Sequence, residues 1–304
     1  MSLLIGLIGK GAISQFYITA LEGSKNFELA AICDRCEDKL EPCRDRIDTF
    51  TSHQDLLTQA EVDAVIVTVP NDQHFQICKD ALLAGKHVCC EKPLTIRMEE
   101  ADELVALSRK TGRTLFTAFH RRYNHNFRTA LEHMPDLSCI EKVTARYLEN
   151  IEEHVDEDAW YLQPDRCGGG CITDIGPNAY DMLATVMGRM HVVSATVDGE
   201  HRGIERRATI GLQSESGIPA DVHLDWAFAG EKKDVIFDLK DGRQIRADML
   251  AGYEGFKSSL FHEYEAVLAD FEREIAEGKC HGERGCDVVR LVQETYKLAN
   301  RDDP

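Results

Sequence analysis

The alternation of short apolar runs with amphipathic segments in the first 120 residues constrains the fold more than any other feature of this chain. The runs hold few polar residues, as parallel strands buried on both faces do. They cover residues 3–9, 28–33, 63–69, 86–90 and 114–119. Segments 12–23, 72–85 and 97–112 place apolar residues three and four positions apart and end at glycine, which indicates helices. Residues 1–120 are therefore predicted to form an α/β domain with a doubly wound parallel sheet.

From about residue 121 the pattern changes to that of an antiparallel sheet. In 218–226 every second residue is apolar, with Ala220, Val222, Leu224 and Trp226 on one face and Asp221, His223 and Asp225 on the other. Strands are also predicted at 142–148 and 191–197, and a hairpin at 234–247 that turns at Asp241 and Gly242. Residues 259–278 form an amphipathic helix whose apolar side holds Leu260, Tyr264, Val267, Leu268, Phe271 and Ile275. The second domain, residues 121–304, is predicted to be α+β with a mostly antiparallel sheet.

Composition and charge exclude several classes of protein. No apolar run approaches the ~18–20 residues that cross a bilayer, so no membrane partner is expected. Thirty-five Lys and Arg against 53 Asp and Glu give a net charge of −18, which would repel a nucleic acid backbone. The N-terminus has no basic leader or cleavage site and is predicted to be a buried strand, which points to the cytoplasm.

The 11 cysteines are an odd number scattered through predicted strands, which favours reduced thiols over a disulfide framework. Cys33, Cys36 and Cys43 are close together in the sequence, but no second pair follows at the spacing of a zinc ribbon. No metal is predicted.

A glycine-containing turn connects the first predicted strand to the first helix. In "GLIGKGAIS" (6–14), Gly9 and Gly11 let the backbone approach a pyrophosphate at the helix N-terminus, while Ser14 takes the place of the usual third glycine. Asp34 ends the second strand, where a carboxylate binds the adenosine ribose hydroxyls. Together these features predict dinucleotide binding. Arg35 has three open roles: stacking on adenine, binding a 2'-phosphate, or lying in solvent.

Lys92 follows the fourth apolar run in "CEKPLT" (90–95). The carboxyl ends of strands in a doubly wound sheet face the ligand crevice, so Lys92 is predicted to lie near the cofactor. A second motif, "CGGGCITDIGPNAYD" (167–181), places Pro177 in the first turn of a helix, which by itself indicates no more than a glycine loop and a helix start.

With "VPNDQH" (69–74) and "AFHRRYNHNFR" (118–128), these motifs make the sequence resemble the superfamily of glucose-fructose oxidoreductase and inositol dehydrogenase, Gfo/Idh/MocA. The resemblance covers nearly the whole chain and implies NAD or NADP as cofactor, with NAD favoured by Asp34. The implied cofactor-binding residues are Gly9, Lys10, Gly11, Ala12, Ile13, Asp34, Arg35, Pro70, Asn71, His74, Glu91 and Lys92. Lys92 matches the active-site lysine of the family, as base or as hydroxyl ligand, and Asp174 matches its substrate-binding or catalytic aspartate.

Asn178 departs from the family pattern. Many members, including the inositol dehydrogenases, carry their proposed acid/base histidine at the matching position, whereas "DIGPNA" is similar to the aldose 1-dehydrogenase branch. Asn178 would then bind the sugar while another group moves the proton. Lys92 is the first candidate for that group; His120 and Tyr161 are the alternatives, and both also have ordinary structural interpretations.

The resemblance predicts an NAD(P)-dependent dehydrogenase of a sugar-like CH-OH group, with an aldose 1-dehydrogenase as the first expectation and Lys92, Asp174 and Asn178 as its catalytic residues. Two alternatives stay open: a dehydrogenase of an inositol or modified sugar at another ring carbon, and a non-catalytic regulator that binds dinucleotide and sugar. Family members usually pair through the open face of the second sheet, so a homo-oligomer, a dimer or tetramer, is expected.

Overall fold

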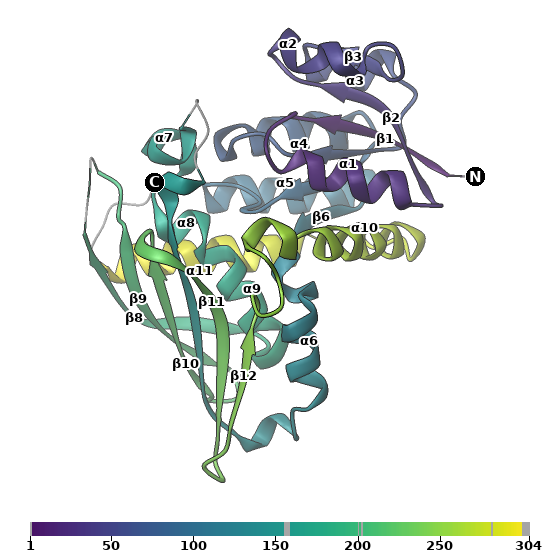
Figure 1. Cartoon of the computed structure of the whole chain (residues 1–304). Helices are drawn as coiled ribbons and strands as arrows, with labels where there is room; N and C mark the ends of the chain where they lie inside the picture. The colour runs from purple at the N-terminus through teal and green to yellow at the C-terminus, as the bar shows by residue number, and fades with distance from the viewer. Residues whose placement is uncertain (1, 155–158, 200, 202, 281, 300–304) are drawn as a thin grey trace. The chain divides into compact units, whose positions relative to one another are not determined.

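The computed structural model describes residues 2–154, 159–199, 201, 203–280 and 282–299. Contacts divide the chain into two units (Figure 1): one contains 1–118 and 264–286, the other 119–263 and 287–304. The second unit is thus interrupted by a segment that returns to the first. The single boundary predicted after residue 120 does not take this return into account.

The first unit holds a six-stranded parallel sheet in the order β3-β2-β1-β4-β5-β6. The strands are β1 (Leu3–Ile8), β2 (Phe27–Cys33), β3 (Asp48–Phe50), β4 (Ala64–Val67), β5 (His87–Glu91) and β6 (Leu115–Ala118). All four residues of β4 are fully buried, as a strand covered on both faces requires. The doubly wound sheet is confirmed, and so is the N-terminal strand. The sequence prediction missed β3.

The helices of the first unit are α1 (Ser14–Gly23), α2 (Glu37–Leu40), α3 (His53–Gln59), α4 (His74–Leu83) and α5 (Met98–Thr111), with short 3-10 turns at η1 (Glu41–Cys43) and η2 (Asn71–Gln73). Helix α1 packs against β2, and α4 packs against β4 and β5 (Figure 1). From residue 264 onward α10 (Phe261–Ala276) adds aromatic rings to this core: Tyr264 contacts the rings of Phe16 and Tyr17, and Phe271 contacts those of Phe27 and Phe116.

The second unit holds a mixed sheet in the order β12-β11-β7-β10-β9-β8. Its strands are β7 (Ile140–Asn150), β8 (Met190–Asp198), β9 (Arg207–Ser214), β10 (Pro219–Asp225), β11 (Ala227–Leu239) and β12 (Gln244–Asp248). The predicted antiparallel character holds for every pair except one: β10 runs antiparallel to β9 but parallel to β7. The alternation in β10 is confirmed, since Ala220, Val222 and Leu224 are buried and the residues between them are more exposed.

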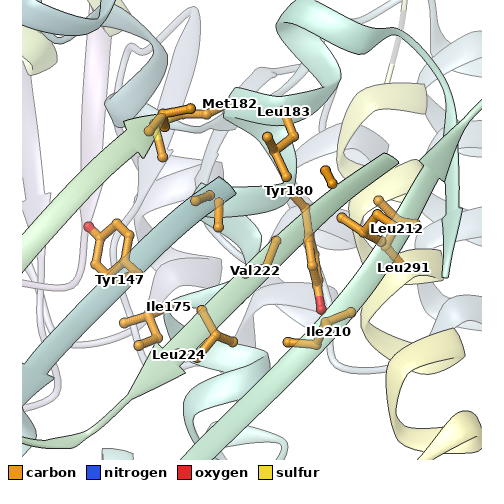
Figure 2. Packing of buried hydrophobic residues seen from close by; sticks show 14 of the residues in the cluster. Tyr147, Ile175, Tyr180, Met182, Leu183, Ile210, Leu212, Val222, Leu224 and Leu291 are labelled. Atoms are coloured by element: carbon orange, nitrogen blue, oxygen red, sulfur yellow. The ribbon is translucent and has the colours of Figure 1, made fainter. Parts of the chain in front are cut away.

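The helices of the second unit are α6 (His125–Glu132), α7 (Pro164–Cys167), α8 (Cys171–Asp174), α9 (Gly176–Met187) and most of α11 (Glu283–Leu298). Its 3-10 turns are η3 (His120–Tyr123), η4 (Leu137–Cys139), η5 (Ile151–Glu153), η6 (Trp160–Leu162) and η7 (Phe256–Ser259). Figure 2 shows how Tyr180 and Leu183 of α9 meet Val222, Ile210 and Leu212 of the sheet in one buried apolar cluster. This packing fixes α9 on the sheet.

Within the described part of the chain, no helix combines the length and the apolar character that crossing a bilayer requires.

Candidate functional site

The glycine turn after β1 has a backbone that only glycine adopts without strain. Gly9 has φ +99°, and its N–H donates to the carbonyl of Cys33 at 2.8 Å. A Cβ at Gly9 would lie 2.8 Å from the carbonyl carbon and oxygen of Thr68. At Gly11 the nearest heavy atom to such a Cβ would be the carbonyl oxygen of Thr68 at 4.0 Å, an ordinary van der Waals contact. The turn is therefore tightly packed at Gly9 and has room for a Cβ at Gly11. Ala12, next to Gly11, is exposed, and Ile13 stands directly before α1 without a capping side-chain hydrogen bond.

Asp34 lies directly beside this turn. Its carboxylate accepts the backbone N–H of Lys10 at 2.7 Å and that of Cys36 at 2.9 Å, and the Lys39 ammonium is 3.9 Å away. The structure thus brings Asp34 together with Gly9 and Lys10. Arg35 is exposed and its guanidinium donates to the side chain of Gln73.

The loop after β4 leads through Pro70 to Asn71, which is buried at the start of η2. His74 is fully buried: its Nδ1 lies 2.7 Å from the carbonyl oxygen of Pro93 and its Nε2 lies 2.9 Å from that of Val69. Burial lowers the pKa of His74 to about 4, although the two carbonyl contacts by themselves raise it. Burial favours the neutral ring, which can donate to only one of these carbonyls, whereas the two contacts together favour the charged ring. The ring lies between the loop after β4 and the segment after β5.

Glu91 and Lys92 stand at the carboxyl end of β5, and the peptide bond from Lys92 to Pro93 is cis. Glu91 is buried and accepts the hydroxyl of Tyr17 at 2.8 Å. Burial raises the pKa of this carboxyl, while Lys92 and the hydroxyls of Tyr17 and Tyr264 act in the opposite direction. Lys92 is half-buried. Neither tyrosine was predicted to contact Glu91, because both occupy apolar positions of helices, where sequence patterns indicate only packing.

In the second unit, Asp174 ends α8 and Asn178 lies in the first turn of α9; they are 5% and 3% exposed. The glycine loop before them wraps around Glu205, whose carboxylate accepts the N–H groups of Gly170 and Ile172 and the hydroxyl of Tyr296. A Cβ at Gly170 would lie 2.3 Å from the carbonyl oxygen of Glu205. Close packing against Glu205 thus explains the glycine at position 170. The hydrogen bonds to Glu205 position the start of α8, and through it α9.

His120 in η3 joins Asn178 to a buried carboxylate. Nδ1 of His120 lies 2.6 Å from Oε2 of Glu263, and Nε2 lies 3.4 Å from Nδ2 of Asn178. Glu263 also accepts from Arg121 at 2.9 Å and from Asn124 at 2.7 Å. Burial opposes the charge of Glu263, but Arg121 and the hydrogen bond from His120 outweigh it and keep the pKa of this carboxyl below its usual range.

Tyr161, the other alternative for proton transfer, is half-buried in η6 and stacks on the ring of Trp160. Sequence reasoning did not find Glu263. One signal was present: three residues after Leu260 and one before Tyr264, Glu263 falls on the apolar side of its helix, where an acid needs a partner.

The cysteines that raised the question of a metal differ in environment, since Cys33 and Cys43 are buried and Cys36 is exposed. Among the described residues, one group of three potential metal ligands has its ligand atoms within 4.8 Å of one another: Glu149, His154 and Glu231. The Lys233 ammonium lies 2.8 Å from Glu149 and 3.0 Å from Glu231, so a side-chain cation already serves both carboxylates.

The first unit fits a dinucleotide. The turn at Gly9 and Gly11, the acid at Asp34 and the pair Glu91 and Lys92 all follow carboxyl ends of parallel strands, at the edge where doubly wound sheets bind ligands. Gly11, half-buried and without a side chain, lies just before α1, where helix N-termini bind phosphates.

Comparison with known proteins agrees with this geometry. The family model "Oxidoreductase family, NAD-binding Rossmann fold" matches residues 3–119, and the model "GFO/IDH/MocA C-terminal domain" matches residues 137–244. The oxidoreductase YdgJ of Escherichia coli, which is uncharacterized, is 31% identical over 64% of this chain and 56% of its own length. The chain spans about half the length of this and the other first curated relatives it matches.

A myo-inositol 2-dehydrogenase of Thermotoga maritima is 28% identical over 96% of this chain and 83% of its own length. Among solved structures, scyllo-inositol dehydrogenase from Lactobacillus casei, with bound NAD(H) and scyllo-inositol, has a TM-score of 0.85. At 17% identity, with 100% of this chain and 98% of that one covered, this likeness concerns the fold.

Proposed function

This chain belongs to the Gfo/Idh/MocA family of oxidoreductases, and we propose that it is an NAD-dependent dehydrogenase that oxidises a carbinol carbon of a sugar, as an aldose 1-dehydrogenase. The observation that carries the proposal is the edge of the parallel sheet where the Gly9 turn, Asp34 and Lys92 all follow strand ends. Bound nicotinamide supplies the acceptor for the hydride.

The residues around the turn hold the cofactor. Backbone N–H groups at Gly11, Ala12 and Ile13 face the pyrophosphate, and Asp34 accepts the ribose hydroxyls. Each oxygen of Asp34 receives one backbone N–H and keeps a lone pair for a hydroxyl, and its charge disfavours a 2'-phosphate. NAD is therefore preferred over NADP.

We assign Asn71, His74 and Glu91 to the support of the loops around the nicotinamide.

Asp174 and Asn178 bind the sugar, and Lys92 is a ligand of the reacting hydroxyl. The support for the sugar site is the amide of Asn178: within the described chain its side-chain oxygen is buried and has no hydrogen-bond partner. A buried acceptor without a donor costs about 1–3 kcal/mol, which a sugar hydroxyl would recover. An aldose offers several such donors.

The test is turnover of purified protein with NAD+ or NADP+ and a panel of aldoses and inositols, followed by the absorbance of the reduced nicotinamide. We expect aldoses with NAD+ to give the highest kcat/KM. Oxidation of an inositol alone would favour the second candidate, which has support from the T. maritima relative. Tight binding of NAD and sugar without turnover would identify a non-catalytic regulator.

We also propose a homo-oligomer, dimer or tetramer, that pairs through the open face of the second sheet. That face carries half-exposed Asp221, His223 and Asp225, and Asp221 forms an ion pair with Lys142. Such polar pairs suit a wet interface between copies. A monomer by light scattering at micromolar concentration would contradict this.

A further inference from the structure

His120 lies in a buried chain of side chains that has the form of an acid/base unit. It is 4% exposed, and its two ring nitrogens face different partners: Glu263 at 2.6 Å on Nδ1 and Asn178 at 3.4 Å on Nε2. The carboxylate of Glu263 accepts only, so Nδ1 carries the hydrogen and donates. Nε2 of the neutral ring is then the basic atom, and in this structure it accepts the N–H of Asn178 at 3.4 Å, a place that the hydroxyl of a bound sugar would have to take.

Two observations separate this arrangement from an ordinary buried histidine. The first is that the neighbouring oxygen of Asn178 has no hydrogen-bond partner among the described residues, although it is buried. Most buried polar atoms have a partner, so this oxygen can accept from a hydroxyl of a bound sugar; Nη2 of Arg121 in the same network is also unsatisfied among the described residues. The second is that the ion pair with fully buried Arg121 already balances the charge of Glu263. Oε2 of Glu263 is therefore left to accept the Nδ1 hydrogen of His120, while Oε1 accepts from Arg121.

Resting on the proposed function, we propose that His120 is the general base for sugar oxidation in this chain and that Glu263 is its positioning residue. In this chain the imidazole comes from η3 and contacts the amide of Asn178. In the oxidative direction the hydroxyl O–H bond breaks and its proton moves to Nε2 of His120. The C–H bond electrons leave as hydride to oxidised nicotinamide, and the C=O bond forms.

The charged groups around His120 allow this cycle. Glu263 and Arg121 form one buried pair, and on α9 Asp181 is bound by Arg122 at 2.7 Å. The neutral form of His120 is the base, so kcat/KM for oxidation rises with pH through one ionisation, and that for reduction falls through the same ionisation.

The experiment measures pH profiles of kcat and kcat/KM for the wild type and for H120Q, with NAD affinity and circular dichroism as checks on folding. Gln keeps a donor for Glu263 but cannot take up a proton. We expect kcat to fall roughly 10²–10⁴-fold, the general-base contribution, with the ionisation lost and NAD affinity unchanged. K92M should lower the rate but keep the ionisation. E263Q should move the ionisation to lower pH, because the imidazolium loses its carboxylate.

The double variant H120N/N178H provides a rescue that a structural role would not show. It exchanges the two neighbouring side chains and so keeps an imidazole in the pair, and we expect it to recover at least part of the activity that H120N loses. H120Q with wild-type turnover and pH profile would overturn the role of His120 and leave the proposed function intact. A wild type that oxidises no member of the panel would overturn both.

Discussion

Replacing Gly9 by alanine should damage folding, whereas the same change at Gly11 should damage cofactor binding alone. An alanine at φ +99° is strained by about 1–3 kcal/mol. Its Cβ would also lie 2.8 Å from the backbone of Thr68, and relieving that contact by moving strand ends costs about 1–3 kcal/mol more. The sum, about 2–6 kcal/mol, corresponds to a fall in the melting temperature of the first unit on the order of 10 °C.

Gly11→Ala is the matched control, because its Cβ would have no neighbour nearer than 4.0 Å. Its melting temperature should stay within a few degrees of wild type, while the added methyl group meets the pyrophosphate and weakens NAD binding by about tenfold or more. Differential scanning calorimetry and isothermal titration with NAD+ measure the two effects. If the two variants have the same melting temperature, or if Gly11→Ala binds NAD+ with the affinity of the wild type, the difference in packing assigned to Gly9 and Gly11 is wrong.

Three further predictions concern single side chains. Asp34→Ala should weaken the binding of NAD+ by about 10–100-fold, the cost of hydrogen bonds to a charged acceptor, and the binding of NADP+ much less. Equal losses of affinity for both cofactors in titrations would refute the proposed preference for NAD. Asn178→Ala should weaken transition-state binding, measured from kcat/KM, by about 1–3 kcal/mol. Its effect on the melting temperature should be small, because it removes a buried acceptor without a partner but also the N–H that contacts His120; unchanged kcat/KM would exclude Asn178 from the sugar site. The pKa of His74 falls from 6.5 to about 4 on folding, so below pH 6.5 the unfolded state binds a proton that the folded state does not. The free energy of unfolding of the wild type should therefore fall by up to about 3 kcal/mol between pH 6.5 and 4. Urea titrations should show no such loss in His74→Gln, and an equal loss in both proteins would contradict this prediction.

Patterns within one segment predicted the fold well, because buried parallel strands and amphipathic helices leave their periodicity in the sequence. The three residues of β3 were missed since they are polar or half-exposed and too few for a pattern. The alternation in β10 was recognised, but alternation reports which face is buried and not the direction of a neighbour, so its parallel pairing with β7 was not predictable.

The candidate site divides in the same way. Gly9, Asp34 and Lys92 follow strand ends, and their positions came from local rules. The link between His120 and Glu263 spans 143 residues, and no local rule connects η3 to the start of a distant helix. Only the charged residue on the apolar side of that helix hinted that a buried partner existed.

The return of residues 264–286 to the first unit has a consequence for the order of events on the ribosome. N-terminal domains generally fold first during synthesis. Here Phe16, Tyr17, Phe27 and Phe116 are made early, yet the rings of Tyr264 and Phe271 that cover them are translated only after β7 to β12. The nascent parallel sheet therefore lacks these ring contacts until nearly the whole chain has been translated, and a fragment cut at codon 120 would expose the aromatic side chains that α10 covers in the full chain.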